Sequence, residues 1–241
     1  MSRLSQKFLS ARRNSSLVVL EGFHPVKHAL AFGYSVEIYT CAKNKLIQTA
    51  HRLAPALSPS FEEAIEISPA KFAALSPNYI KTRVIGLASK PNYSFEQIHQ
   101  NSGRVLALEN IRNLKNLGAI VRTAAARGVA GILYSGTLDC WNPNCLVVSR
   151  GLHLGVPIVA VKEMAVTLST FTHRTKIGLD GDGKILEKGS IPENALLCFG
   201  SERSGLSAQS KSKLTALVRI PMQPEVSSLN LASAVAITLY Q

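Results

Sequence analysis

The chain has 241 residues, of which 46% are hydrophobic and 17% are charged. This length predicts one or two compact domains, and the apolar content excludes an intrinsically disordered chain. Charged residues or histidine interrupt each apolar run before it reaches the roughly 18 residues that a membrane-spanning helix needs. We therefore expect a soluble protein of the cytoplasm with no membrane partner.

The net charge is +12, from 27 Lys and Arg against 15 Asp and Glu, and the excess lies in both halves of the chain. Lys and Arg contacts to phosphates supply sequence-independent affinity for nucleic acid. Many soluble proteins are merely basic, so charge alone leaves this function open. The four cysteines show no CxxC spacing and no histidine at metal-ligand spacing, which predicts reduced thiols and no metal.

The first twenty residues hold four basic residues, five serines and no acid. This composition suits an organelle transit peptide. It equally suits a basic amphipathic helix with Phe8 and Leu9 as its apolar pair, and we favour the helix.

The rest of the first hundred residues follows an α/β pattern. Apolar runs at 17–20, 36–41 and 84–88 predict strands, and residues 25–32 predict a helix. We assign residues 1–95 to a small domain, with the polar stretch 89–103 as the linker.

From Arg104 to the C-terminus the alternation of strands and helices is regular. The strand-like runs are 105–108, 131–134, 157–161, 176–179, 195–199 and 216–220. This pattern predicts a parallel sheet in a second domain, residues 104–241. Ligands of such sheets bind beyond the carboxyl ends of strands, so we look for chemistry just after Leu108, Phe199 and Ile220.

Polar and small residues follow the first of these strands and open a helix. Asn116 can cap the helix, Gly118 permits close backbone approach, and Arg122 lies six residues after Asn116. Such a site can hold a phosphate. Taken alone, the segment is better explained as a capped helix with a solvent-facing arginine, because both features are common.

The other two strand ends carry comparable segments. Residues 200–207 place Glu202 between two glycines, which suits a ligand loop or a plain turn with Ser207 as helix cap. Residues 220–237 bring Ser228 and Asn230 to the start of a helix rich in small residues, which also suits a tightly packed core helix.

The three segments together resemble the SpoU, or TrmH-like, branch of the SPOUT class of RNA ribose methyltransferases. Its motifs have the forms Asn-x-Gly-Ala-Ile-x-Arg-Thr-Ala, Gly-x-Glu-x-x-Gly-Leu-Ser, and Ile-Pro-Met followed by Ser-Leu-Asn, and the chain carries all three in order. Departures are Asn113 and Leu114, where relatives commonly have Asp-Pro, and Arg127, where an aromatic residue is common. They concern substrate preference more than catalysis.

The resemblance implies an α/β domain whose C-terminal part forms a deep trefoil knot. It implies that backbone groups of Gly200, Ile220 and Leu229 bind S-adenosylmethionine, and that a ribose 2′-hydroxyl of RNA accepts the methyl group. The residues that it implies for catalysis are Arg122, which holds the phosphate beside the target ribose, and Asn116, Glu202, Ser228 and Asn230, which fix the geometry.

It further implies a homodimer through the knot region. Residues 20–22 and 84–88 are similar to the small ribosomal-protein-like RNA-binding domain that often precedes this catalytic domain. That extra domain favours ribosomal RNA over transfer RNA as the substrate. The alternatives are a transfer RNA 2′-O-methyltransferase and a non-catalytic relative that binds RNA or the ribosome. A nucleotide-dependent oxidoreductase or hydrolase would need a GxGxxG or Walker-type loop, and neither occurs.

The run Asp180-Gly-Asp-Gly resembles the start of a calcium loop, but Lys184 and Ile191 occupy positions where ligands are required. We therefore expect a hairpin turn between residues 176–179 and 185–186.

Overall fold

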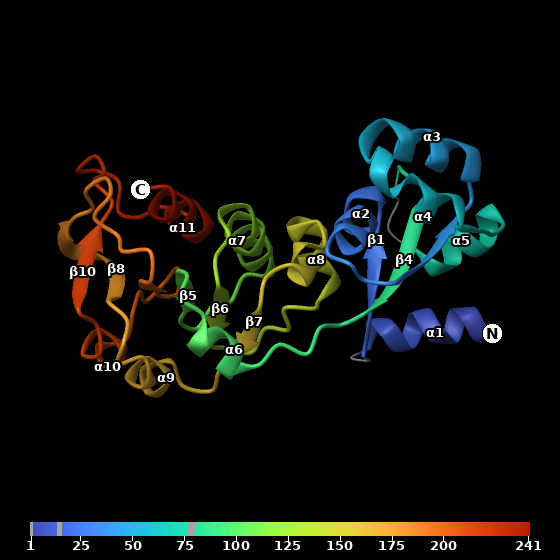
Figure 1. The fold of residues 1–241 in the computed structure, drawn as a ribbon. Helices are drawn as coiled ribbons and strands as arrows, with labels where there is room; N and C mark the ends of the chain where they lie inside the picture. Colours follow the sequence, from blue (N-terminus) through green and yellow to red (C-terminus); the bar gives the residue numbers. More distant parts are fainter. Residues whose placement is uncertain (1, 14–15, 77–80) are drawn as a thin grey trace. The chain divides into compact units, whose positions relative to one another are not determined.

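The computed structural model describes residues 2–13, 16–76 and 81–241. Two compact units make up the chain, one from residues 1–92 with 141–155 and one from residues 93–140 with 156–241. Both are α/β (Figure 1). Within the described residues, no helix combines the length and the apolar character needed to cross a membrane.

The first unit is built on a four-stranded sheet of order β1-β4-β2-β3, in which only β2 and β3 run parallel. Its strands are β1 (Leu17–Glu21), β2 (Val36–Thr40), β3 (Ile65–Glu66) and β4 (Val84–Ser89). Its helices are α1 (Arg3–Arg12), α2 (Phe23–Ala31), α3 (Lys43–Leu53), η1 (Pro55–Leu57), α4 (Ser58–Glu62), α5 (Pro69–Leu75), α8 (Pro143–Ser149) and η2 (Leu152–Leu154). The strands predicted at 17–20, 36–41 and 84–88 and the helix at 25–32 are confirmed within a residue or two.

Side chains alternate between the two faces of this sheet. Val18 and Leu20 pack with α2, α3 and α4, whereas Val19 packs with Phe8 of α1 and Phe72 of α5. The predicted N-terminal helix is confirmed, but its apolar partner is wrong: Leu9 is exposed, and Ala11, three residues after Phe8, is buried instead. Residues three apart share a helix face, which adjacent residues do not.

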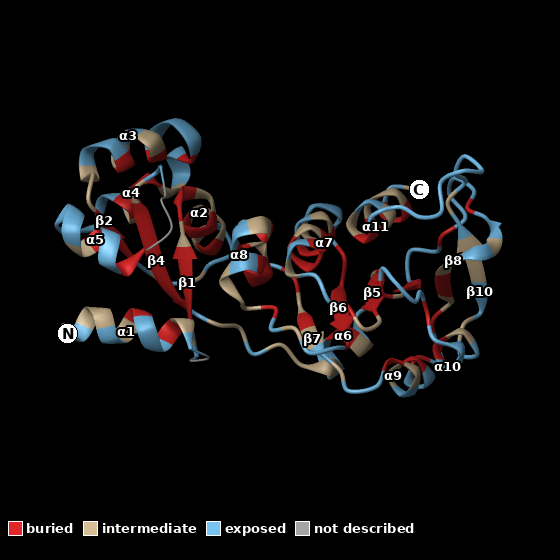
Figure 2. Ribbon diagram, turned by 180° about the vertical axis from the view of Figure 1, so that it is seen from behind, coloured by how far each residue is buried: buried red, intermediate tan, exposed pale blue. Residues whose placement is uncertain are grey.

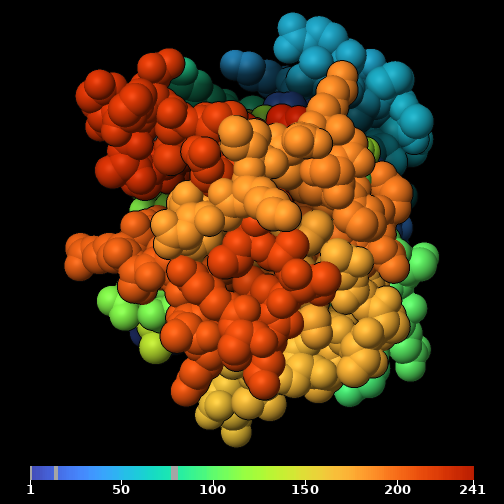
Figure 3. All heavy atoms as spheres, turned by 90° about the vertical axis from the view of Figure 1, so that its left-hand side faces the viewer, coloured from blue at the N-terminus to red at the C-terminus, as the bar shows by residue number. Residues whose placement is uncertain are grey.

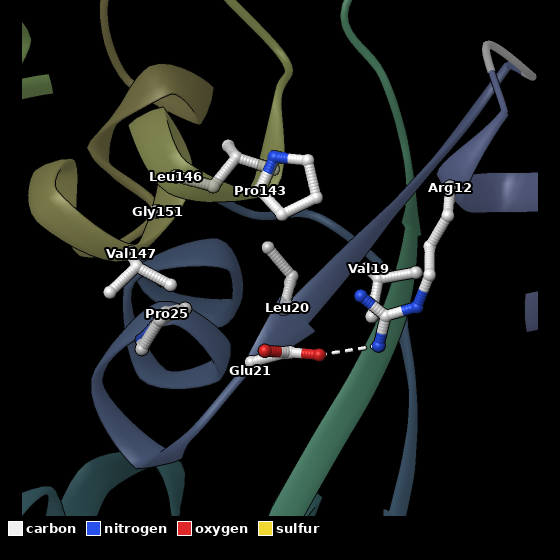
Figure 4. Close-up of a pocket in the computed structure, with 9 residues that line it drawn as sticks. All are labelled: Arg12, Val19, Leu20, Glu21, Pro25, Pro143, Leu146, Val147 and Gly151. Carbon is white, nitrogen blue, oxygen red and sulfur yellow. Dashed lines mark hydrogen bonds and ion pairs between the residues drawn. The ribbon is translucent and has the colours of Figure 1, made fainter. Parts of the chain in front are cut away.

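Residues 141–155 complete the first unit. Leu146 of α8 and Leu154 of η2 join the same buried cluster as Leu20 and Phe23. Figure 4 shows Leu146 and Pro143 of this segment together with Leu20 and the Arg12–Glu21 ion pair. The space between them is about 10 Å³, which is the size of one water probe and too small for a ligand.

The second unit holds a six-stranded sheet of order β10-β8-β9-β5-β6-β7, and each neighbouring pair is parallel. Its strands are β5 (Val105–Leu108), β6 (Gly131–Tyr134), β7 (Ile158–Ala160), β8 (Lys176–Ile185), β9 (Leu196–Phe199) and β10 (Ala216–Arg219). Its helices are α6 (Phe95–Gln100), α7 (Leu114–Arg127), α9 (Met164–Thr170), α10 (Ala208–Lys211) and α11 (Leu231–Leu239). The predicted parallel sheet is therefore confirmed.

Helices cover both faces of this sheet. α7 and α11 lie side by side on one face, and α6 and α9 lie on the other (Figures 1 and 2). Strands β5, β6 and β9 are buried along their whole length, which explains why they read as continuous apolar runs. The polar stretch 89–103 is not all linker, because Ser94 and Gln97 form a capping box that starts α6.

The hairpin expected after Leu179 is wrong. β8 runs in one direction from Lys176 to Ile185, and its register against β10 shifts so that Leu217 lies opposite Gly178 and Val218 opposite Lys184. The intervening residues form a bulge that is closed by a hydrogen bond from the Asp182 N–H to Asp180. The turn-forming residues after Leu179 therefore interrupt the pairing between β8 and β10, and they do not reverse the direction of the chain.

The bulge is also held by an ion pair between Asp180 Oδ2 and Lys211 Nζ, at 2.6 Å. Burial acts to raise the pKa of the Asp180 carboxyl, but the hydrogen bonds from Lys211 and from the Asp182 N–H outweigh it. The pKa of Asp180 consequently lies below its ordinary value, and the carboxylate stays charged near neutral pH.

Candidate functional site

The candidate site lies in the second unit, at the carboxyl ends of β5, β9 and β10. The loops that follow these strands carry the three segments singled out from the sequence. Figure 3 looks onto the β8–β10 end of this unit, where the orange and red parts of the chain form the surface.

The start of α7 decides which asparagine is available to a ligand. Asn113 is the N-cap, and its Oδ1 accepts hydrogen bonds from the backbone N–H groups of Lys115 and Asn116. The prediction that Asn116 caps the helix is therefore wrong. Because Asn113 takes that role, the buried side chain of Asn116 is released for contacts in the site.

Asn116 joins the three segments through its side-chain amide. Its Nδ2 donates to Glu202 Oε1 at 2.5 Å, and its Oδ1 accepts from Asn230 Nδ2 at 3.0 Å. These residues are separated by 86 and 114 positions in the chain. The hydrogen-bonded series from Glu202 through Asn116 to Asn230 is called the amide chain below.

The direction of every bond in the amide chain is fixed. Asn230 is the N-cap of α11, and its Oδ1 accepts from the N–H groups of Ala232 and Ser233. Its Nδ2 must therefore face Asn116, whose oxygen accepts and whose own Nδ2 is left to donate to the Glu202 carboxylate. The N-cap of α11, at one end of the amide chain, thus determines that Asn116 presents its Nδ2 to the Glu202 carboxylate at the other end.

The amide chain borders a polar cavity of about 750 Å³. The cavity is lined by Arg112, Asn113, Asn116, Ser201, Glu202, Arg203, Ser204, Ser228, Leu229 and Asn230. A second, more apolar cavity of about 170 Å³ is lined by Leu179, Asp180, Gly181, Arg219, Ile220, Met222, Ser227, Ser228, Leu229 and Ala234. Ser228 and Leu229 line both, so the two cavities adjoin at the third motif.

Gly200 allows the second motif to fold as a closed loop. A Cβ at this position would lie 1.9 Å from the carbonyl carbon of Gly205, so no other residue fits without moving the backbone. The N–H of Gly205 donates to the Ser201 carbonyl, which closes the loop. Glu202 lies at its tip, exposed toward the cavity.

Arg122 lies apart from the other candidate residues. It is exposed on α7, and neither cavity is lined by it. Six helical residues turn the chain through about 600°, so Arg122 points away from the face that carries Asn116. Arg112 and Arg203, which the sequence reasoning did not single out, are the cations that line the polar cavity. Their signal was a basic residue close to each motif side chain, because Arg112 lies four residues before Asn116 and Arg203 follows Glu202 inside the second motif.

Buried thiols near the site are structural. Burial raises the pKa of the Cys198 thiol on β9, so it stays neutral. Within the part of the chain that the structure describes, the four cysteines form no disulfide. Among the described residues, no group of three or more His, Cys, Asp or Glu is arranged to hold a metal ion.

The parallel sheet and the three loops at its carboxyl edge define an α/β enzyme class whose ligands bind beyond the strand ends. The family model of the SpoU rRNA Methylase family matches residues 103–240. The chain therefore belongs to this family.

Relatives agree with this assignment. A 23S rRNA (adenosine(1067)-2′-O)-methyltransferase of Streptomyces laurentii is 34% identical over 167 residues, which are 67% of this chain and 62% of that protein. The chain thus spans less than two thirds of that relative. The 23S rRNA (guanosine(2553)-2′-O)-methyltransferase RlmP of Bacillus subtilis is 26% identical, over 95% of this chain and 89% of that protein.

The fold is shared with the SpoU methyltransferase AviRb of Streptomyces viridochromogenes, solved in complex with AdoMet. The TM-score is 0.78 at 22% identity, and the match covers 100% of this chain and 96% of that one. An AdoMet-bound rRNA methyltransferase of Sinorhizobium meliloti gives a TM-score of 0.76 at 20% identity, over 99% and 93% of the two chains.

Proposed function

We propose that the protein is an S-adenosylmethionine-dependent RNA methyltransferase that acts on the ribose 2′-hydroxyl of ribosomal RNA in the cytoplasm. The observation that carries this proposal is the amide chain, which joins the polar residues of all three family motifs beside a cavity. The names of the curated relatives support ribosomal RNA as the substrate class.

The residues present fit the methyl donor. The apolar cavity offers Ile220 and Leu229 to a flat apolar group, and Gly200 allows the loop of the second motif to close. We assign cofactor binding to these three residues. S-adenosylmethionine, when bound, supplies a methyl group on a positively charged sulfur. No metal is required by this assignment.

The polar cavity is assigned to the reacting ribose and its phosphate. A neutral hydroxyl is a poor nucleophile, so its proton must leave as it reacts, and we assign acceptance or relay of this proton to the phosphate beside the target ribose. Glu202, held by Asn116, and Ser228 and Asn230 supply acceptors and donors that fix the hydroxyl. The guanidinium of Arg122 stays protonated and cannot be a general base by itself, so we assign it to the neighbouring phosphate.

The exposure of Arg122 bears on assembly. An arginine outside its own cavity is available to a second copy or to the RNA backbone. The loop of residues 221–230 is exposed throughout and includes Met222, Val226 and Leu229. Such an apolar patch favours a homodimer through the C-terminal region, in which we propose the trefoil knot.

We assign residues 1–95 to RNA binding. The segment is basic, and Arg3 of α1 is exposed, whereas Lys7 and Arg12 of the same helix pair with Glu37 and Glu21. The catalytic domain then comprises residues 104–241, although residues 141–155 belong to the first compact unit. A transfer RNA substrate and a non-catalytic role remain the alternatives, and the experiment below separates them.

The test is in two steps. Calorimetric titration with S-adenosylhomocysteine measures cofactor binding, and transfer of a labelled methyl group to ribosomal and transfer RNA from a strain lacking the protein measures activity. We expect binding, and 2′-O-methylation of ribosomal RNA. Absence of binding would overturn the methyltransferase proposal, binding without transfer would support the non-catalytic relative, and methylation of transfer RNA alone would reassign the substrate.

A further inference from the structure

Glu109 is a charged residue at the carboxyl end of β5 that none of the motif arguments used. Its Oε1 accepts from the hydroxyls of Ser207 at 2.7 Å and Ser210 at 2.8 Å, and its Oε2 accepts from the backbone N–H of Ser207 at 2.9 Å. One carboxylate therefore receives three hydrogen bonds from two residues almost a hundred positions away. Hydrogen bonds to a charged acceptor are about twice as strong as neutral ones.

The partners of Glu109 stand where the second motif ends. Ser207 is the N-cap of α10, and its Oγ accepts from the N–H of Ser210. Ser210 is fully buried, so its hydroxyl depends on this carboxylate. The backbone N–H of Glu109 also donates to the carbonyl of Phe199 at 2.8 Å. Glu109 thus holds both ends of the loop that runs from Gly200 to Leu206.

This loop is short and closed by its own hydrogen bonds, so the position of its base determines the position of its tip. Ser201 and Gly205 pair across it, and the hydroxyls of Ser201 and Ser204 lie 2.7 Å apart. With the base clamped, the loop holds Glu202 at 2.5 Å from Asn116. Glu109 also begins the connection to α7, which carries Asn116, so it ties together the two elements that this contact spans.

We propose that Glu109 is a positioning residue of the reaction, which fixes the second-motif loop through Ser207 and Ser210 and thereby sets the contact between Glu202 and Asn116. This inference rests on the proposed function. It adds a residue outside the five assigned to catalysis. The carboxylate itself accepts hydrogen bonds from Ser207 and Ser210, and it does not line either cavity.

The variants Glu109→Gln and Glu109→Ala remove part and all, respectively, of the hydrogen-bond acceptors of Glu109. Glutamine keeps an oxygen for the two hydroxyls but turns an NH₂ toward the Ser207 N–H, whereas alanine removes every acceptor. Loss of charge-assisted hydrogen bonds that order a reacting geometry lowers kcat by about tenfold for glutamine and about a hundredfold for alanine. Glu193→Gln is the matched control, because that carboxylate lies in the same unit, is 87% exposed and accepts one hydrogen bond from Arg104.

The experiment measures three quantities on the full chain: thermal unfolding, the Kd of S-adenosylhomocysteine and kcat at saturating cofactor and RNA, at a temperature where every variant is folded. A double-mutant cycle pairs Glu109→Gln with Glu202→Gln. If Glu109 acts by positioning Glu202, kcat falls in the order Glu, Gln, Ala, the Glu193 control is unchanged, and the paired losses are far from additive.

The possible failures are distinguishable. If the wild-type chain binds no S-adenosylhomocysteine and transfers no methyl group, the proposed function fails. If the wild type is active and the folded Glu109 variants keep its kcat, or if their losses add to those of Glu202→Gln, Glu109 only stabilises the fold and the inference is overturned.

Discussion

Removing the side chain of Asn116 tests whether the amide chain serves the reaction. The variant Asn116→Ala loses the donor to the Glu202 carboxylate and the acceptor for the Asn230 amide. A hydrogen bond to a charged group contributes about 1.5–3 kcal/mol and a neutral one about 1 kcal/mol. Together they amount to about 2.5–4 kcal/mol, which corresponds to a fall in kcat of about a hundredfold to a thousandfold.

The matched control is Ser94→Ala at the start of α6 in the same unit. It removes an N-cap and costs about 1 kcal/mol of stability, but leaves the amide chain in place. Single-turnover methyl transfer at saturating cofactor and RNA gives the rate, and urea unfolding gives the stability of each variant. A folded Asn116→Ala protein that transfers methyl groups within about twofold of the wild-type rate would refute the reasoning.

Three further predictions concern the surroundings of the site. Arg104→Met leaves the carbonyls of residues 191 and 192 without their guanidinium donor and removes one of two donors from that of residue 239, so urea unfolding should show a loss of about 3 kcal/mol; an unchanged midpoint would contradict it. Gly200→Ala should abolish S-adenosylhomocysteine binding because its Cβ meets backbone, whereas Gly189→Ala, which lies outside both cavities and has nothing within 4 Å, should bind like wild type; similar binding by both variants would argue against the closed loop. Because the pKa of Asp180 is lowered in the folded state, its stabilisation is present at neutral pH and is lost as the pH falls below about 4. Wild type should therefore lose more unfolding free energy than Asp180→Asn between about pH 5 and pH 3, and equal losses would count against the Lys211 pair.

The strands and their order along the chain were predictable from the sequence. Buried parallel strands such as β5 and β9 are short apolar runs, and that local signal needs no knowledge of the partner strand. The three motifs were also predictable as loops at the carboxyl edge of the sheet, because they follow strand ends. The cap at Ser207 was offered as one reading and is confirmed, since a cap bonds to its own helix.

What only the tertiary structure decided involves contacts between distant residues. Asn113 and Asn116 are chemically equal candidates for the cap, and the choice depends on Glu202 and Asn230, which lie far away in sequence. The turn-like residues after Leu179 proved to be a bulge because the neighbouring strand continues parallel on both sides of it.

Arg122 and Glu109 show the same difference between what the sequence predicts and what the tertiary structure decides. The motif identifies Arg122, but the helical turn places it on an exposed face away from the amide chain. Glu109 had no sequence signal, since a carboxylate at a strand end gains its role only from the two serines that fold back onto it. Periodicity and turn chemistry are local, so they fix elements along the chain. Hydrogen bonds across about a hundred residues depend on how the elements pack, and they decide which side chains meet.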